Sequence, residues 1–234
     1  MVPELERLIQ AHQNIVFFGG AGVSTESGIP DFRSVDGLYH QKFKYPPETM
    51  LSHTFYETHT AEFFDFYRQK LIVHGAKPNA AHLRLAALER EGKCKAVVTQ
   101  NIDGLHQAAG SKTVYELHGS TLRNYCTRCG KFFPVQFIED AAGVGDGVPR
   151  CDECGGIVKP DVVLYEEGLD EETMENAVHA IRGADTLIVG GTSLAVYPAA
   201  GLLRYFRGEN LVVINKQPTP ADAMANLLIH APIG

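Results

Sequence analysis

The sequence predicts an α/β fold in which a parallel sheet is covered by helices on both faces. Short apolar runs, at residues 15–18, 96–98 and 211–214, alternate with stretches of helical period. Strands buried on both faces give continuous apolar runs, and helical connections between them make neighbouring strands parallel. Polar or glycine-rich residues follow directly after most of these runs, and ligands bind at this end of such a sheet.

The apolar and helical periods assign most of the chain to individual elements. The expected strands cover residues 14–18, 95–99, 113–117, 161–164, 184–189 and 210–214. The expected helices cover residues 4–12, 57–73, 80–90, 170–182 and 197 to about 206, and Asn79 suits the N-cap of the third. Residues 34–60 show no clear period and predict loops with short helices.

The composition is that of an ordinary globular protein and argues against several classes of partner. The 234 residues suffice for one large domain, or a large domain with a smaller insert, and 44% of them are hydrophobic. The apolar runs fall short of the roughly 20 residues that a membrane helix needs, so we expect no membrane partner. The net charge of −7 argues against nucleic acid and is compatible with basic peptides. No secretory signal is visible, so we expect a cytoplasmic location.

A glycine-rich stretch, residues 19–33, follows the first expected strand and predicts a turn and then the start of a helix. Glycines let a ligand approach the main chain closely, and a helix N-terminus suits a diphosphate. Gly20 and Gly22 match the dinucleotide-binding pattern G-x-G-x-x-G, but Thr25 replaces the third glycine, and no strand with an acidic ribose ligand follows. These glycines alone are compatible with a diphosphate-binding loop or with a structural turn.

Four of the five cysteines form a C-x2-C…C-x2-C pattern, made by Cys126, Cys129, Cys151 and Cys154. This spacing is close to that of a zinc ribbon, because two residues between cysteines let both sulfurs face one ion. Four thiolates complete a tetrahedral shell, so we expect one structural zinc ion per chain. Two redox dithiols or four unrelated thiols are the alternative, and Cys94 lies outside the pattern as a small core residue.

Polar residues that follow different strands would converge at one edge of the sheet. They are Gln100, Asn101, Asp103, His118, Thr192, Ser193 and Asn215. A bland interpretation exists for several of them, since a histidine can be purely structural and Asn101 and Asp103 can form turns or cap a helix. Their convergence is a stronger signal than any single motif.

The chain resembles the sirtuin family at motifs spread over nearly its whole length. The matching stretches occur in the family's order and are residues 20–33, 99–106, 117–119, the four cysteines, 159–163 and 191–194. The resemblance implies NAD-dependent removal of acyl groups from protein lysines, with transfer of the acyl group to ADP-ribose and release of nicotinamide. It also implies a Rossmann-like NAD-binding domain (1–33, 95–120 and 159–234), a loop and helical insertion (34–94) and a zinc-ribbon module (121–158).

The resemblance also implies which residues bind NAD. The phosphates would be held by Gly20, Ala21, Gly22, Ser24 and Thr25. The loop over the cofactor would include Phe32 and Arg33, and the ribose hydroxyls or an ordered water would be held by Gln100 and Asn101. The nicotinamide carboxamide would contact Ile102 and Asp103. The adenosine side would contact Thr192, Ser193, Asn215 and Ile233, and since the family usually continues into a further helix, we expect less cover over the adenine.

By the same resemblance, His118 is the general base and Asn101 is the second catalytic residue. An imidazole with a pKa near ~6.5 can deprotonate a ribose hydroxyl at neutral pH. The acetyl-lysine peptide would add as a strand beside Val162, Val163 and Leu164 on one side and Ala195 and Val196 on the other.

Two other functions stay open at this point. A protein ADP-ribosyltransferase could present the same activated ribose to another nucleophile, and a non-enzymatic module could bind NAD or ADP-ribose. An ordinary dehydrogenase fits least, because of Thr25 and the missing acidic ribose ligand. Sirtuins that prefer acidic acyl chains carry a Tyr-x-x-Arg pair. Here Phe64 and Tyr67 stand at those places and Arg68 is one position off, so we expect acetyl and other neutral acyl groups.

Overall fold

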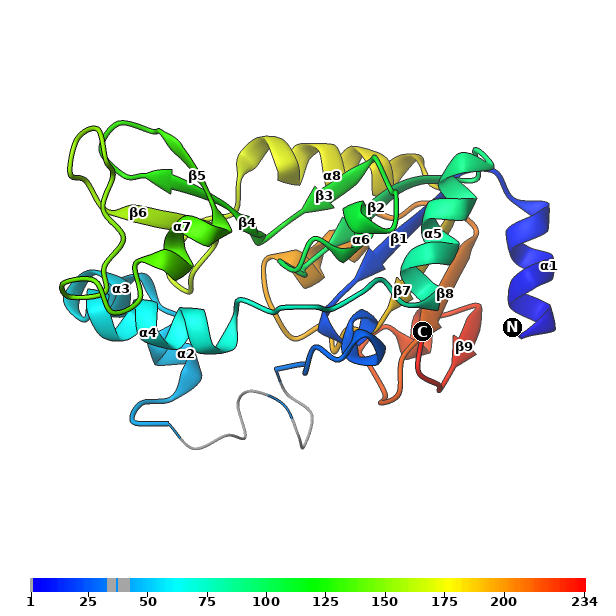
Figure 1. Ribbon diagram of the computed structural model, residues 1–234. Coiled ribbons are helices and arrows are strands. Elements are labelled where there is room, and N and C mark those ends of the chain that lie inside the picture. Colours follow the sequence, from blue (N-terminus) through cyan, green and yellow to red (C-terminus); the bar gives the residue numbers. More distant parts are fainter. Residues whose placement is uncertain (1, 33–36, 38–42) are drawn as a thin grey trace.

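The computed structural model describes residues 2–32, 37 and 43–234, and its centre is a six-stranded sheet (Figure 1). The strands stand in the order β3-β2-β1-β7-β8-β9, and every neighbouring pair is parallel. Their bounds are β1 (Ile15–Gly19), β2 (Cys94–Thr99), β3 (Val114–Glu116), β7 (Thr186–Gly190), β8 (Asn210–Ile214) and β9 (Leu227–Ile229). The chain order reverses between β1 and β7, and ligands bind at such a switch point.

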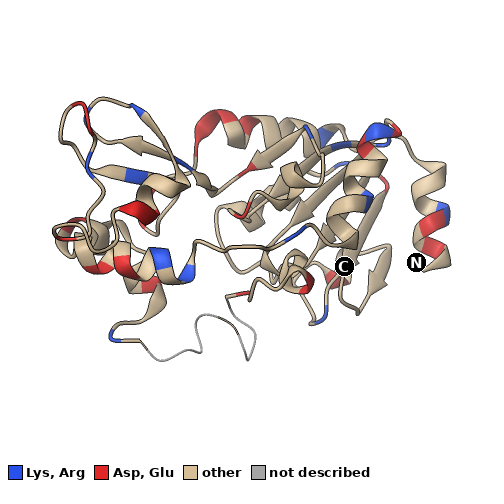
Figure 2. Cartoon of the chain, viewed as in Figure 1, with Lys and Arg blue, Asp and Glu red and all other residues tan. Residues whose placement is uncertain are grey.

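Helices cover both faces of this sheet. The first face packs against α8 (Glu171–Gly183) and the 3-10 helix η4 (Ala199–Tyr205), and the second against α1 (Pro3–Ala11) and α5 (Ala80–Arg90). Strand β1 contributes to both, because successive side chains point to opposite faces. The central strands β1, β7 and β8 carry no charged residue, whereas charges gather on the helices and loops (Figure 2). The predicted α/β class is therefore confirmed.

A small module packs beside the large sheet. Its antiparallel sheet has the order β5-β4-β6, with β4 (Gly119–Cys126), β5 (Phe132–Pro134) and β6 (Val158–Val162). Its helices are α2 (Pro47–Met50), α3 (His53–Thr58), α4 (Thr60–Lys70) and α7 (Val135–Asp140). The aromatic side chains of α3 and α4 form its core together with residues of the sheet. These aromatics are therefore core residues of the small module.

The two sheets are joined through the short stretch between β3 and β4. Arg123 on β4 pairs with Glu116 on β3 (Nη1 to Oε2, 2.6 Å) and with Asp161 on β6 (Nε to Oδ2, 2.8 Å). Gly119, at the start of β4, has φ +75°, and a Cβ there would collide with the carbonyl oxygen of Asp161. A residue with a side chain would therefore push β4 away from β6 within the small sheet, next to the joint.

Three expected helices differ from the structure. The helix expected over 57–73 is split into α3 and α4, because His59 has φ −133° and ψ 46°, outside the helical region. The helix expected after the glycine turn is replaced by two 3-10 turns, η1 (Ala21–Val23) and η2 (Thr25–Ser27). The helix expected from residue 197 is the 3-10 helix η4, which begins at Ala199.

One expected strand also differs, and three further strands are present that the sequence did not predict. The strand expected over 161–164 is β6, which begins three residues earlier and lies in the antiparallel sheet. Pro160 is accepted there because β6 is an edge strand. The stretch 210–214 is not the last strand, since β9 follows it, and β4, β5, α7 and α6 (Leu105–Ala108) were not expected. No helix in the described part of the chain is both long and apolar enough to cross a membrane.

Two histidines lie buried side by side where α5 packs against α6. His82 and His106 have ring centroids 4.7 Å apart and are 0% and 1% exposed. Neither ring nitrogen of His106 has a hydrogen-bond partner among the described residues. Burial, reinforced by His82, lowers the pKa of His106 to about 3, and burial also lowers the pKa of His82. Both rings are therefore neutral in the folded protein at neutral pH.

We predict that this pair makes the protein sensitive to acid. Because the unfolded chain takes up these protons near pH ~6.5 and the folded chain does not, the free energy of unfolding falls as the pH drops below that value. His106 alone should contribute a loss of about 2 kcal/mol between pH 7 and pH 5. Denaturant titrations at the two pH values should show a smaller loss for His106→Phe, whereas the exposed His179→Gln should behave like the wild type. Equal losses in all three proteins would contradict the prediction.

Candidate active site

A cavity of about 390 Å³ lies at the carboxyl ends of the parallel strands and extends to the small module. Its walls come from the stretches that follow β1, β2, β3, β7 and β8, and from residues 162–167 at the end of β6 and after it. The switch point between β1 and β7 thus opens into this cavity, in agreement with the general position of ligand sites in parallel sheets.

The cavity gathers nearly all residues to which the sequence assigned a role with NAD. These lining residues are Gly20, Ala21, Gly22, Ser24, Thr25, Phe32, Gln100, Asn101, Ile102, Asp103, His118, Thr192, Ser193, Asn215 and Ile233. Arg33 lies outside the described residues. Of the residues expected beside a peptide, Val162, Val163, Leu164 and Val196 line the cavity and Ala195 does not.

The glycine loop is packed tightly against the loop after β7. The amide of Gly22 donates to the carbonyl oxygen of Gly191 at 2.8 Å. A Cβ at Gly22 would lie 2.8 Å from that same oxygen, and a Cβ at Gly20 would lie 2.9 Å from the Cβ of Thr192. Neither glycine has a positive φ, so the close approach of the two loops is what requires them. These glycines therefore have a structural role in the packing of the two loops, and they also line the cavity.

A chain of polar side chains connects the glycine loop to the stretch after β2. The amide of Asn101 (Nδ2) donates to Ser24 Oγ at 3.1 Å, and Ser24 Oγ donates to Asp103 Oδ2 at 2.6 Å. The other oxygen of Asp103 accepts the amide of Leu105 at 2.9 Å, at the start of α6. Ser24 and Asn101 are buried. The turn-forming role considered for Asp103 is therefore present, and it fixes the orientation of the carboxylate beside the cavity.

His118 follows β3, and its ring is oriented by the backbone after β2. Its Nδ1 lies 3.1 Å from the carbonyl oxygen of Gln100, which can only accept, so Nδ1 carries the proton and Nε2 keeps its lone pair. Burial lowers the pKa of His118, and the hydrogen bond to Gln100 offsets part of this effect. The half-buried imidazole is thus neutral at pH 7 and can accept a proton on Nε2.

Gln100 also connects two strand ends through its side chain. Its Nε2 donates to Oγ1 of Thr192 at 3.1 Å, and Thr192 belongs to the loop after β7. Thr192 Oγ1 in turn accepts the amide of Leu194 at 3.2 Å. The stretches after β1, β2, β3 and β7 are therefore joined by hydrogen bonds around one cavity.

The four cysteines of the C-x2-C pairs come together in the small module, away from this cavity. Their Sγ atoms all lie within 4.8 Å of one another, with 3.4 Å between Cys126 and Cys154 and 3.7 Å between Cys129 and Cys151. Tetrahedral zinc with Zn–S bonds of 2.3 Å would hold its sulfurs about 3.8 Å apart. The donor set therefore fits one zinc ion and leaves no open coordination position, and none of the four residues lines the cavity. Zinc here would be structural.

The sequence missed several residues of the cavity wall. Lys216 follows β8 directly after Asn215, so the strand-end signal used for its neighbour would have found it. Lys70 at the end of α4 and Tyr165, Glu166 and Glu167 after β6 also line the cavity. They come from the small module, whose packing against the large sheet has no signature in the local sequence.

The whole chain is similar to proteins of one family. The model of the Sir2 family matches residues 20–198. An "NAD-dependent protein deacetylase" of Clostridium acetobutylicum is 62% identical over 100% of this chain and 95% of its own length. A protein of the same name from Clostridium perfringens is 59% identical over 100% of this chain and 95% of its own length.

Solved structures agree with the sequence comparison. A complex of Sir2 with a p53 peptide and NAD+ has a TM-score of 0.88 and 39% identity, over 100% of this chain and 94% of that chain. Sir2Tm bound to a propionylated peptide has a TM-score of 0.87 and 38% identity, over 98% of this chain and 92% of that chain. With the cysteine cluster and the cavity at the switch point, these matches show that the chain belongs to the Sir2 family, the sirtuins.

Proposed function

We propose that this protein is an NAD-dependent protein-lysine deacetylase that transfers the acyl group to ADP-ribose and releases nicotinamide. The observation that carries the proposal is the position of His118. His118, whose Nε2 keeps its lone pair, lines a cavity that is also lined by the glycine loop and the stretch 100–103. The relatives named as NAD-dependent protein deacetylases support the same activity. Mass spectrometry of an acetyl-lysine peptide incubated with and without NAD tests it, and loss of the acetyl group only with NAD is expected.

The cavity offers donors and acceptors suited to NAD. When bound, NAD supplies a ribose carbon that becomes electrophilic as nicotinamide departs. We propose that Gly20, Ala21, Gly22, Ser24 and Thr25 hold the phosphates, and that Thr192, Ser193, Asn215 and Ile233 hold the adenosine. Ile102 and Asp103 would receive the carboxamide, and Gln100 and Asn101 the ribose hydroxyls or a water. Phe32 and Arg33 would cover the cofactor.

The remaining steps depend on what the side chains do with protons and water. The partly enclosed, largely apolar walls keep water from the reacting carbon, so the acyl oxygen of the modified lysine meets less competition. Nε2 of His118 then accepts the proton of a ribose hydroxyl, which makes that oxygen nucleophilic. Asn101, held by Ser24, would orient the groups around that hydroxyl.

We propose that the substrate peptide enters as a strand between the residues after β6 and the loop after β7. Val162, Val163 and Val196 line the cavity from these two sides, and solved Sir2 structures contain acetylated or propionylated peptides. The net charge of −7 complements basic peptides. We also propose the domain division given by the family resemblance, and a cytoplasmic location, which four free thiols suited to zinc support.

Replacing His118 by Ala or Tyr should reduce turnover of an acetyl-lysine peptide by a factor of about 10² to 10⁴, because the general base is lost. Wild-type activity should persist at pH ~6.5 and fall only at lower pH, because protonation removes the lone pair of Nε2 and burial lowers the pKa of His118 below its ordinary value. Zinc content and the unfolding temperature of the variant serve as controls. Near-normal turnover in a clean His118→Ala preparation would remove His118 from this role, and label left on protein would indicate ADP-ribosyl transfer.

The residues at and beside the places of the Tyr-x-x-Arg pair, Phe64, Tyr67 and Arg68, do not line the cavity, and this supports a preference for neutral acyl groups. Phe64 and Tyr67 do not line it, contrary to the expectation from the family pattern, because both are fully buried in the core of the small module. Arg68 donates to the carbonyl oxygens of Ile138 (3.3 Å) and Gly147 (2.8 Å), so it is not aimed at the cavity.

We therefore predict that acetyl-lysine peptides are turned over at least about tenfold better than succinyl-lysine peptides, because an unpaired carboxylate is costly to bury. Competing kcat/KM measurements on otherwise identical peptides check this. Faster desuccinylation would contradict it. In that case loss of the activity in Lys70→Met would identify the cation responsible, since Lys70 lines the cavity.

Removal of zinc should unfold the small module rather than only slow the reaction. Structural zinc contributes an apparent free energy of about 10–16 kcal/mol in small zinc modules, so Cys126→Ser or a strong chelator should abolish metal binding and most of the fold around β4 and β6. Metal analysis should give about one zinc per chain, and Cys94→Ser should keep it. A metal-free wild-type protein with the same unfolding temperature would contradict the prediction.

A further inference from the structure

A short segment after β6, residues 163–167, connects the cavity to the small module. All five of its residues line the cavity. At its start, the amide of Val163 donates to the carbonyl oxygen of His118 at 3.0 Å. The segment therefore begins next to the residue proposed as the base and continues along the wall proposed for the peptide.

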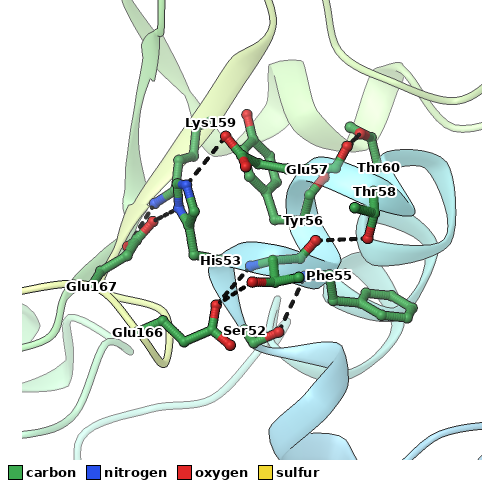
Figure 3. Close-up of polar contacts among 11 residues, drawn as sticks. Ser52, His53, Phe55, Tyr56, Glu57, Thr58, Thr60, Lys159, Glu166 and Glu167 are labelled. Atoms are coloured by element: carbon green, nitrogen blue, oxygen red, sulfur yellow. Dashed lines mark hydrogen bonds and ion pairs between the residues drawn. The ribbon is translucent and has the colours of Figure 1, made fainter.

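The middle of the segment forms backbone hydrogen bonds with Leu51 and His53, just before and at the start of α3. The amide of Tyr165 donates to the carbonyl oxygen of Leu51 at 3.0 Å, and its own carbonyl oxygen accepts the amide of His53 at 2.9 Å. The next residue, Glu166, has φ 78°, a left-handed conformation that is unusual for a residue with a side chain. Its carboxylate accepts the amide and the hydroxyl of Thr54, at 2.9 and 2.7 Å, and so holds this conformation (Figure 3).

The carboxylate of Glu167 binds both to the backbone of its own segment and to side chains of neighbouring elements. Its Oε2 accepts the amide of Leu164 at 2.8 Å. The same oxygen accepts the ammonium of Lys159 at 3.2 Å, and Oε1 lies 2.8 Å from Nδ1 of His53 (Figure 3). One side chain therefore joins the turn itself, strand β6 and helix α3. Burial would raise the pKa of Glu167, but the hydrogen bonds from Leu164, His53 and Lys159 outweigh it, so the pKa lies below its ordinary value.

The two cationic partners are themselves fixed by the neighbouring elements. Lys159 also donates to the carbonyl oxygen of Val162 at 3.0 Å, at the end of β6. The other ring nitrogen of His53 lies 3.3 Å from Glu57, one turn further along α3. The hydrogen bond to Glu167 is the main cause of the raised pKa of His53. Removal of the Glu167 carboxylate would thus leave both partners without their common acceptor and release the turn.

We propose that Glu167 is a positioning residue for the substrate peptide, which acts by holding segment 163–167 against α3 and β6. The inference depends on the proposed function, because it concerns the binding of the acyl-lysine peptide. Binding of NAD should be affected far less, since the residues proposed to hold it follow strands of the large sheet. If Glu167 had a purely structural role, its replacement would instead weaken the binding of peptide and NAD equally, or would lower only the stability of the protein.

The test compares KM for an acetyl-lysine peptide with KM for NAD in Glu167→Ala and Glu167→Gln. The Ala variant should raise the peptide KM about tenfold, equivalent to about 1.4 kcal/mol, with less than about a twofold change in the NAD KM. The Gln variant keeps an oxygen for the amide of Leu164 and should restore part of the loss. Glu62→Gln on α4 makes the same charge change away from the segment, where Glu62 pairs with Lys44, and should match the wild type.

A second variant protects the test against loss of folding. His53→Ala removes one partner of Glu167 and should raise the peptide KM by a smaller factor. In the double variant with Glu167→Gln, the rise in peptide KM should be smaller than the product of the two single rises, because both changes break the same contact. Unchanged peptide KM in folded, zinc-loaded Glu167→Ala and His53→Ala, or equal increases in both KM values, would overturn the inference. A wild-type protein that fails to deacetylate the peptide would instead overturn the proposed function.

Discussion

The contact on which the rest of the cavity depends is the close approach of two loops at the switch point of the sheet. The amide of Gly22 reaches the carbonyl oxygen of Gly191, and there is no room for a Cβ at Gly22. This contact sets where the first 3-10 turns begin, and these turns place Ser24 within reach of Asn101 and Asp103. A bulkier residue would separate the two loops and with them the polar chain that follows.

The small module supplies what the parallel sheet lacks. A parallel sheet concentrates polar groups at one edge but leaves that edge open to water. The zinc-type cysteine cluster and the aromatic core of α3 and α4 hold a second sheet against it, and residues 163–167 then form a wall of the cavity. Polar contacts of Glu166 and Glu167 attach this wall to α3, where apolar packing alone would leave the register undetermined.

Much of the fold could be predicted because buried strands and helix caps have local signatures. The strand 210–214 and the helix 80–90 with its Asn79 cap agree with the structure residue for residue, because each has a strong apolar run or a capping residue. The break at His59, the 3-10 turns after Gly20 and the edge strand with Pro160 depend on tertiary packing, which outweighs local preference.

More of the cavity's residues than of the fold's details could be predicted, because these residues follow strand ends and match family motifs. The strand-end rule indicated His118, Asn101 and Thr192 without any knowledge of distances. It could not indicate Glu167 or Lys70, which reach the cavity only through the packing of the small module. The tautomer of His118 was also beyond the sequence, since it depends on a carbonyl group that belongs to Gln100.

The link between β3 and β4 has a consequence for movement. His118 and Gly119 stand at the joint between the two sheets, and Arg123 braces that joint by ion pairs to Glu116 and Asp161. Any rotation of one sheet relative to the other turns the backbone on either side of the imidazole. The residue proposed as the base therefore lies on the chain that connects the two sheets, so the position of its ring depends on how both sheets are placed relative to each other.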